Sequence, residues 1–272
     1  MKELIIEKID SLPPLPKSVL ELEKFRKLPN KDPRELRSII EKDPLMITTI
    51  LRVANSAMFA FKDKVETPSR AISLLGTNFC ISIALGSVVQ NLIKSNLEAY
   101  DATTDDFLFI SNLSSMLINA WISSVDEGLK DELMLAAFLQ EIGKFIISDL
   151  IVENNLIQEF QDKLKENDIE NVEKEFMGFS CSRITANIFK HWNLSPNLIF
   201  TIGFVNDLDS CPKEFIKKAQ ILQIVKILCD ITEPLSDGTI KRAIAKAIEY
   251  NFDIEPLVNA IDSLKVKISK EP

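Results

Sequence analysis

The residues of this chain that could do chemistry are few. His191 is its only histidine, and two of its carboxylates, Glu141 and Asp149, lie about two helical turns apart in one apolar stretch. A hydrolytic metal site needs several imidazole and carboxylate ligands that converge and leave a position open for water. One histidine cannot supply that set, so a metal site would have to use scattered carboxylates such as these two. A Ser-His-Asp or Cys-His device would need His191, and no nucleophile elbow is present. The sequence therefore predicts no catalytic residue, no metal ligand and no cofactor.

The cysteines offer no alternative chemistry. None of the four, which are Cys80, Cys181, Cys211 and Cys229, has a partner at C-x-x-C spacing. Neither a zinc knuckle nor a redox motif is therefore indicated. Isolated cysteines in apolar surroundings are usually small core residues, and the pattern fits a reducing cytoplasm.

Composition narrows the class of protein. The chain has 272 residues, 46% of them hydrophobic, with a net charge of −8 and a pI of about 5.0. Direct nucleic-acid binding is disfavoured because no dense block of Lys or Arg appears. The start of the chain, at 1–10, does not resemble a signal peptide. The uncharged runs at 71–93 and 107–125 contain recurring Ser and Asn, which favours buried helices over membrane insertion. We expect a cytoplasmic protein.

Helix starts are the clearest local signals. Four helices are predicted where a short polar residue that can cap backbone amides precedes a proline. These pairs are Asp32-Pro33, Asp43-Pro44, Thr67-Pro68 and Ser195-Pro196. Further helices are predicted at 2–10, 17–27, 77–94, 104–125, 129–150, 153–166, 168–177, 180–192, 212–230, 236–250 and 254–268. No strand is predicted, and the fold class is all-α.

Two segments between helices are unusual. The run Leu12–Pro16 (LPPLP) is extended and is predicted to be a connector packed on its own domain, rather than a ligand for an aromatic groove. After a helix that ends near Asn55, Phe59 and Phe61 lie in a loop. Two interpretations are open. In the first, Asn55 ends the helix and both rings turn inward. In the second, Asn55, Phe59 and Phe61 form an interaction surface.

The stretch Leu135–Ile151 is apolar at helical spacing, and we expect it, with 77–94 and 107–125, at the centre of the fold. Gly143 interrupts it, which indicates that something packs close to the backbone there. Within it, the segment 138–144 (FLQEIGK) resembles the motif of HD-superfamily metal-dependent phosphohydrolases, including the HD-GYP group. Gln140 and Glu141 stand where that motif has its metal-binding His and Asp.

Further blocks resemble the HDOD family, a bacterial output domain related to HD phosphohydrolases. They are Leu12–Pro16, Ile40–Pro44, Leu51–Phe61, Thr67–Asn78 and Glu175–Ser195. The resemblance implies an HD-like orthogonal helical bundle over 1–205, with a C-terminal helical extension, 206–272, packed on it. The chain departs from the family at Cys181, which replaces a frequent His, and at Val205-Asn206, where two His often follow.

The resemblance and these departures imply a non-catalytic signal-transduction or regulatory module that acts through contacts with other signalling proteins. One alternative is a sensor that binds a nucleotide or second messenger in the vestigial HD cleft, with Lys144, Cys181 and Arg183 as ligand contacts. Another is a degenerate hydrolase. A cleft lined by Gln140, Glu141 and Cys181 would favour the sensor, and a filled site would favour the interaction module.

Overall fold

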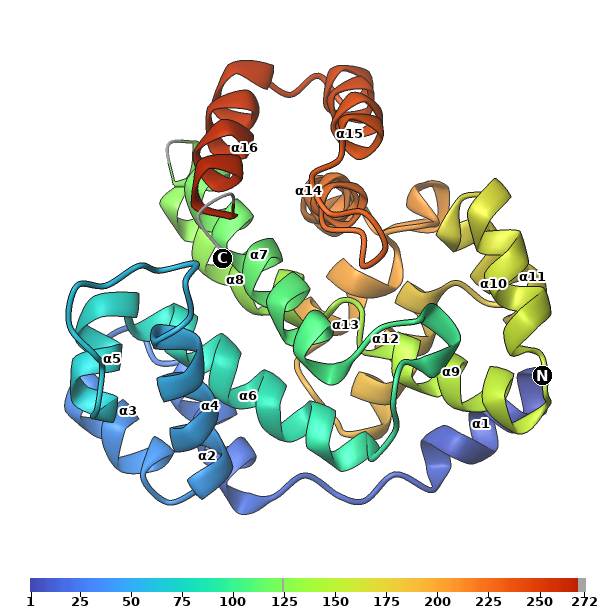
Figure 1. Ribbon diagram of the computed structural model, residues 1–272. Coiled ribbons are helices and arrows are strands. Elements are labelled where there is room, and N and C mark those ends of the chain that lie inside the picture. Colours follow the sequence, from blue (N-terminus) through green and yellow to red (C-terminus); the bar gives the residue numbers. More distant parts are fainter. Residues whose placement is uncertain (124, 269–272) are drawn as a thin grey trace.

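The computed structural model describes residues 1–123 and 125–268 of the chain. Within these residues the fold is all-helical, and the only β pairing is an isolated bridge between Leu97 and Ala102. The N-terminal part comprises α1 (Lys2–Asp10), α2 (Lys17–Arg26), α3 (Pro33–Ile40), α4 (Pro44–Ala54) and α5 (Pro68–Leu75). Figure 1 shows α2 to α5 gathered at one end of the molecule, with α1 at the other end. The predicted fold class is confirmed.

The four predicted helix starts are confirmed in detail. Each begins with proline in the first turn, and the preceding side chain accepts a hydrogen bond from a backbone N–H of that turn. The Asp43 carboxylate, for example, accepts from the amide of Leu45 at 3.0 Å. These caps satisfy amides that have no partner inside the helix.

The proline-rich connector between α1 and α2 packs against the end of α12 (Cys181–His191) and the residues after it. The indole of Trp192 donates a hydrogen bond to the carbonyl oxygen of Pro13 at 2.9 Å. Nε2 of His191 lies 3.3 Å from the carbonyl oxygen of Leu12. The single histidine therefore contacts the connector.

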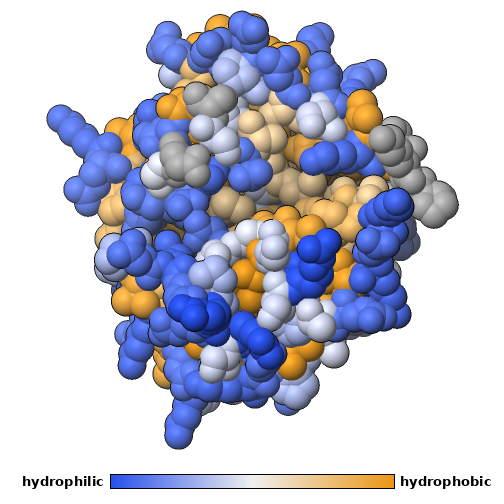
Figure 2. Space-filling view, turned by 90° about the vertical axis from the view of Figure 1, so that its left-hand side faces the viewer, coloured by the Kyte–Doolittle hydropathy of each residue, from blue (hydrophilic) through white to orange (hydrophobic). Residues whose placement is uncertain are grey.

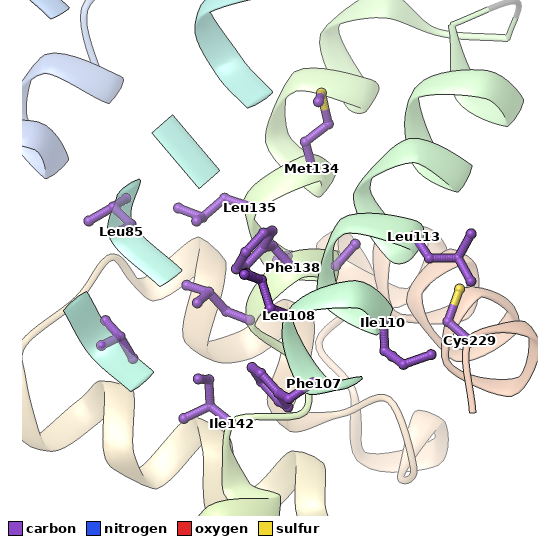
Figure 3. Close-up of a cluster of buried hydrophobic side chains, with 14 of the residues drawn as sticks. Leu85, Phe107, Leu108, Ile110, Leu113, Met134, Leu135, Phe138, Ile142 and Cys229 are labelled. Carbon is purple, nitrogen blue, oxygen red and sulfur yellow. The ribbon is translucent and has the colours of Figure 1, made fainter. Parts of the chain in front are cut away.

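The centre of the molecule is built from α6 (Thr77–Ile93), α7 (Thr104–Ile122) and α8 (Glu127–Leu139). Apolar side chains from all three interlock there, among them Leu85, Phe107, Leu113 and Phe138 (Figure 3). Gly86 on α6 makes room for the ring of Phe138, which a Cβ at that position would overlap. The parts of the uncharged runs that form α6 and α7 are therefore largely buried, and no helix among the described residues is long and apolar enough to cross a membrane.

The predicted continuous helix over 129–150 is wrong. The chain breaks after α8, at residues 140–142, and restarts as α9 (Gly143–Glu153). The hydroxyl of Thr185 on α12 accepts a hydrogen bond from the Gly143 amide at 2.9 Å and donates one to the Gln140 carbonyl at 3.0 Å. These two hydrogen bonds take the place of bonds that a continuous helix would make. The backbone of α12 lies so close that a Cβ on Gly143 would be 2.7 Å from the Cys181 carbonyl oxygen. The close approach expected at Gly143 is confirmed.

The remaining helices cover the sides of this centre. The short helix η1 (Glu98–Tyr100), α10 (Ile157–Glu166) and α11 (Ile169–Met177) lie beside α9 and α12, and α13 (Pro196–Gly203) packs on α12. After η2 (Leu208–Ser210) come α14 (Lys213–Leu228), α15 (Asp237–Glu249) and α16 (Ile254–Ile268). Helix α14 packs against α8 and α13, and α16 packs against α7, as Figure 1 shows for the red helix.

Candidate functional site

The Gln140–Glu141 pair lies at the junction of α8 and α9, inside the protein. Gln140 is fully buried and Glu141 is 7% exposed. Neither atom of the Gln140 side-chain amide has a hydrogen-bond partner among the described residues. An unpaired buried amide is costly, and such groups call for an explanation. At the position where the sequence resemblance predicts metal ligands, Gln140 is closed off from solvent and Glu141 is nearly so.

Glu141 belongs to a buried network of ion pairs. The ammonium of Lys144, 2% exposed, lies 3.0 Å from Glu141 Oε2 and 2.5 Å from Oε1 of Glu173 on α11. The hydroxyl of Tyr100 donates to the same Glu173 oxygen at 3.0 Å, and its ring faces the Lys144 ammonium at 4.8 Å from the centroid. Lys144 is therefore held on several sides.

A second lysine enters the network from α14. The ammonium of Lys226, 5% exposed, lies 3.2 Å from Glu141 Oε1 and 3.5 Å from Glu170 Oε1. It also donates to the hydroxyl of Ser182, which donates to Asn206 at 2.8 Å. The Asn206 amide in turn donates to Glu170. We call Glu141, Lys144, Glu170, Glu173 and Lys226 the buried charge cluster.

The pKa values of the cluster follow from burial and from these contacts. Burial by itself would raise the pKa of Glu141, but the ammoniums of Lys144 and Lys226 outweigh it and lower that pKa below its ordinary value. Burial would lower the pKa of Lys144, and the facing carboxylates Glu141 and Glu173 raise it instead. For Glu170 burial prevails over the attraction of Lys226, and its pKa is raised. The cluster thus holds three carboxylates against two ammoniums.

This arrangement does not fit a divalent metal of the HD type. Two ammonium groups already contact the Glu141 carboxylate that would coordinate a metal, and no group of three or more metal-ligating side chains occurs in the described parts of the chain. Asp149 contributes nothing, since its carboxylate faces Lys8 at 2.5 Å and the Ser95 hydroxyl at 3.0 Å. The two acids considered from the sequence are therefore not brought together.

The three predicted ligand contacts do not share one site. Lys144 belongs to the charge cluster. The Cys181 thiol is fully buried behind it, and burial raises its pKa, which makes it a poor nucleophile. Arg183 lies elsewhere, with its guanidinium 5.0 Å from the Phe204 ring centroid and 3.5 Å from Asp207.

A cavity of about 360 Å³ adjoins the charge cluster between α11, α14 and α15. Glu141, Lys144, Glu170 and Lys226 form one part of its wall, whereas neither Gln140 nor Cys181 lines it. Sequence reasoning missed Glu170, Glu173 and Lys226. Lys226 carried a signal, because a lysine inside the apolar run 224–228 needs a buried partner.

The aromatic loop after α4 is held by Asn55. Its side-chain amide donates to the carbonyl of Val65 and its oxygen accepts from the amide of Val65, both at 2.8 Å. Phe59 and Phe61 stack at 5.8 Å between centroids, and Phe59 meets the ring of Phe79 edge-on. Both rings are half-buried, so they pack on the core and also present a surface. The face of the molecule that Figure 2 shows is largely hydrophilic, with a hollow where apolar residues gather.

Several solved structures resemble the whole fold. A virulence factor from Campylobacter jejuni is 26% identical, with all of both chains covered and a TM-score of 0.57. A candidate phosphohydrolase from Shewanella amazonensis is 21% identical over 99% of this chain and 96% of that one, with a TM-score of 0.68. A candidate signal transduction protein from Marinobacter aquaeolei is 17% identical over 97% of this chain and 59% of that one, with a TM-score of 0.72. The last two likenesses show the fold alone.

An uncharacterized protein from Treponema pallidum is 22% identical over 221 residues, which are 78% of this chain. The chain matches only 40% of the length of that relative. The HDOD domain model matches residues 12–208, which contain the Gln140–Glu141 pair and the helices from α2 to α13. On this match over most of its length, the chain belongs to the HDOD domain family.

Proposed function

We propose that this protein is a non-catalytic regulatory module of bacterial signal transduction that acts through contacts with other signalling proteins. The observation that carries the proposal is the buried charge cluster, in which Lys144 and Lys226 neutralise Glu141 where a hydrolase of this superfamily would bind metal. The two ammonium groups would compete with a metal ion for the oxygens of Glu141, which disfavours hydrolysis by a metal-activated water molecule. The name of the Marinobacter relative, a candidate signal transduction protein, supports the same class of function.

The burial of Gln140 and Cys181 also supports this proposal over a sensor that uses the vestigial HD cleft. Gln140 and Cys181 are fully buried and contribute no wall to the neighbouring cavity. A nucleotide could reach neither of them without opening the junction of α8 and α9. Function would then depend on the outer surface of the domain.

Phe59 and Phe61 are the candidate anchors on that surface. Aromatic side chains dominate the energetics of many interfaces, because they bury a large area at a small cost in conformational entropy. Asn55 holds the loop through Val65, so the stacked pair would be presented in one conformation. A pair already held in one conformation would lose little conformational entropy on binding.

The test is a binding titration with a purified partner, identified beforehand by cross-linking in the native cell. Replacing both rings (Phe59→Ala with Phe61→Ala) should weaken binding by about 1 kcal/mol or more. Phe200→Ala, which removes a partly exposed ring on α13, is the matched control and should leave affinity unchanged. Gln140→Leu should also bind normally, because that side chain is fully buried.

Circular dichroism of each variant separates a lost surface from a lost fold. Weakened binding with unchanged helicity and melting would support the aromatic loop as the docking surface. If only Gln140→Leu lost binding, the proposal would fail in favour of a sensor. If the double phenylalanine variant unfolded, the rings would be core residues and the surface would lie elsewhere.

A further inference from the structure

The cavity beside the charge cluster has walls of two kinds. Its volume of about 360 Å³ lies within the range of small-molecule sites. Part of the lining is aliphatic, contributed by Ile169 of α11, Ile227 of α14 and Ile231, which follows α14. The rest is charged, with five acidic and four basic side chains. Such a cavity suits a small molecule that has a charged end and a hydrocarbon body.

The basic groups of the lining are already paired. Arg242 on α15 forms an ion pair with Asp168, and the Lys246 ammonium lies 2.8 Å from Glu249. Lys144 and Lys226 are shared among the carboxylates of the charge cluster. A phosphate or carboxylate ligand would have to displace one of these partners, so the cavity does not favour an anion.

The acidic groups, in contrast, are in excess. Asp230 follows α14 and lines the cavity, and no described basic side chain lies within ion-pair distance of it, although its negative charge contributes to the raised pKa of Lys144. One oxygen of its carboxylate accepts hydrogen bonds from the amide and hydroxyl of Thr232, at 2.9 and 2.7 Å. Of the residues that the structure describes, Glu170 forms an ion pair with Lys226 alone, at 3.5 Å, and Lys226 lies closer to Glu141, at 3.2 Å. A carboxylate in a partly desolvated cavity attracts a cation more strongly than one in water.

We propose that this cavity binds a small aliphatic amine in its protonated, positively charged form. The ammonium group would lie between Asp230 and Glu170 and supply the positive charge that the lining lacks. The hydrocarbon body would lie against the three isoleucines. The inference goes beyond the proposed function: the cavity borders the buried charge cluster, but binding of the amine does not require the aromatic loop to bind a partner.

The test compares three ligands that share one hydrocarbon chain and differ in charge. Pentylamine, pentanol and pentanoate are each titrated into the full chain by isothermal calorimetry, and the melting temperature is followed in parallel. Pentylamine should bind at one site per chain and raise the melting temperature, which a ligand of the native state does by mass action. Pentanol and pentanoate should show no saturable binding. GTP tests the nucleotide alternative and should also fail to bind.

The location is tested by Asp230→Asn. Asparagine keeps an oxygen that can accept from Thr232, so the end of α14 should keep its conformation. Pentylamine should bind about tenfold more weakly, which corresponds to about 1.4 kcal/mol. The matched control is Glu214→Gln, which makes the same change of charge at an exposed position of α14, away from the cavity. It should bind as the parent does.

Four results would overturn the inference. Equal binding of pentanol would mean an apolar site with no preference for charge. Binding of pentanoate or GTP would mean an anion site, and failure of pentylamine to bind would remove the site altogether. An equal loss in Asp230→Asn and Glu214→Gln would mean general attraction to an acidic protein, which rising salt would also abolish.

Discussion

The ammonium of Lys226 on α14 lies 3.2 Å from Oε1 of Glu141, although Glu141 lies far away in the sequence, between α8 and α9. The contact joins α14 to the junction of α8 and α9, where the sequence resembles the metal-binding motif of the HD phosphohydrolases. Both side chains are nearly excluded from water, so removing either one would leave the other as a buried charge with one ion-pair partner fewer. The helices after residue 208 are therefore electrostatically tied to the HDOD core.

Lys226→Met should destabilise the protein by about 3 kcal/mol, the scale observed when one partner of a buried ion pair is removed. Urea denaturation measures this as a lower midpoint. Lys217→Met, at an exposed position of the same helix, should change stability little. Adding Glu141→Gln to Lys226→Met should recover part of the loss. A double variant as unstable as the sum of the single variants would show that the two residues do not interact.

The stability conferred by Glu141 should depend on pH in the acid range. Its pKa in the folded protein is lower than the ordinary value of 4.5, so its ion pairs contribute stability above that pH. This contribution is lost as the pH falls through the lower folded pKa. The gap in unfolding free energy between the parent and Glu141→Gln should therefore be largest near neutrality and shrink below about pH 4.5.

The raised pKa of Glu170 acts in the opposite sense, since the folded protein then binds a proton more readily than the unfolded chain. Both the parent and Glu141→Gln contain Glu170, which reduces the effect of Glu170 on the difference in unfolding free energy between them. Glu166→Gln, a change at an exposed position of α10, should give a small gap at every pH. A gap for Glu141→Gln that stayed constant from pH 7 to pH 3 would contradict the ion-pair assignment.

Gly143→Ala should cost about 1 to 3 kcal/mol, the usual range for overpacking. The new methyl group would lie 2.7 Å from the Cys181 carbonyl oxygen and 2.9 Å from the Thr185 hydroxyl, both fixed parts of α12 and its surroundings. Gly128→Ala is the control, because the nearest atom there is 3.6 Å away and alanine favours a helix. Thermal unfolding that ranked the two variants in the reverse order would exclude the close approach of α12.

We also propose that residues 206–272 are an extension that the domain of residues 1–205 needs for stability. A chain that ends at residue 206 would lose Lys226 and would expose the surfaces of α7, α8 and α13 that α14 and α16 cover. It should melt at a lower temperature and associate during size-exclusion chromatography, because newly exposed apolar surface promotes aggregation. If the shortened and full chains melted alike and both stayed monomeric, the extension would be an independent appendage.

Local chemistry was sufficient to predict much of this protein from its sequence. A polar cap before proline starts a helix wherever it occurs, so the starts of α3, α4, α5 and α13 could be located without the fold. Long runs without charge had to be buried, which placed α6 and α7 at the centre. The single histidine excluded a histidine-rich metal site, and Gly143 indicated a close contact before its partner was known.

Only the tertiary structure determines which groups surround Gln140 and Glu141. Periodicity at 129–150 predicts one helix, and the break appears only because Thr185, distant in sequence, supplies competing hydrogen bonds. Glu170 and Glu173 are unremarkable charges on α11, and the apolar run around Lys226 indicates a buried partner without identifying it. These three residues meet because α11 and α14 pack around Glu141 and Lys144, where low solvent exposure turns ordinary side chains into mutually dependent ion pairs. Local sequence patterns carry no record of such long-range neighbours, and the cavity between α11, α14 and α15 arises from the same packing.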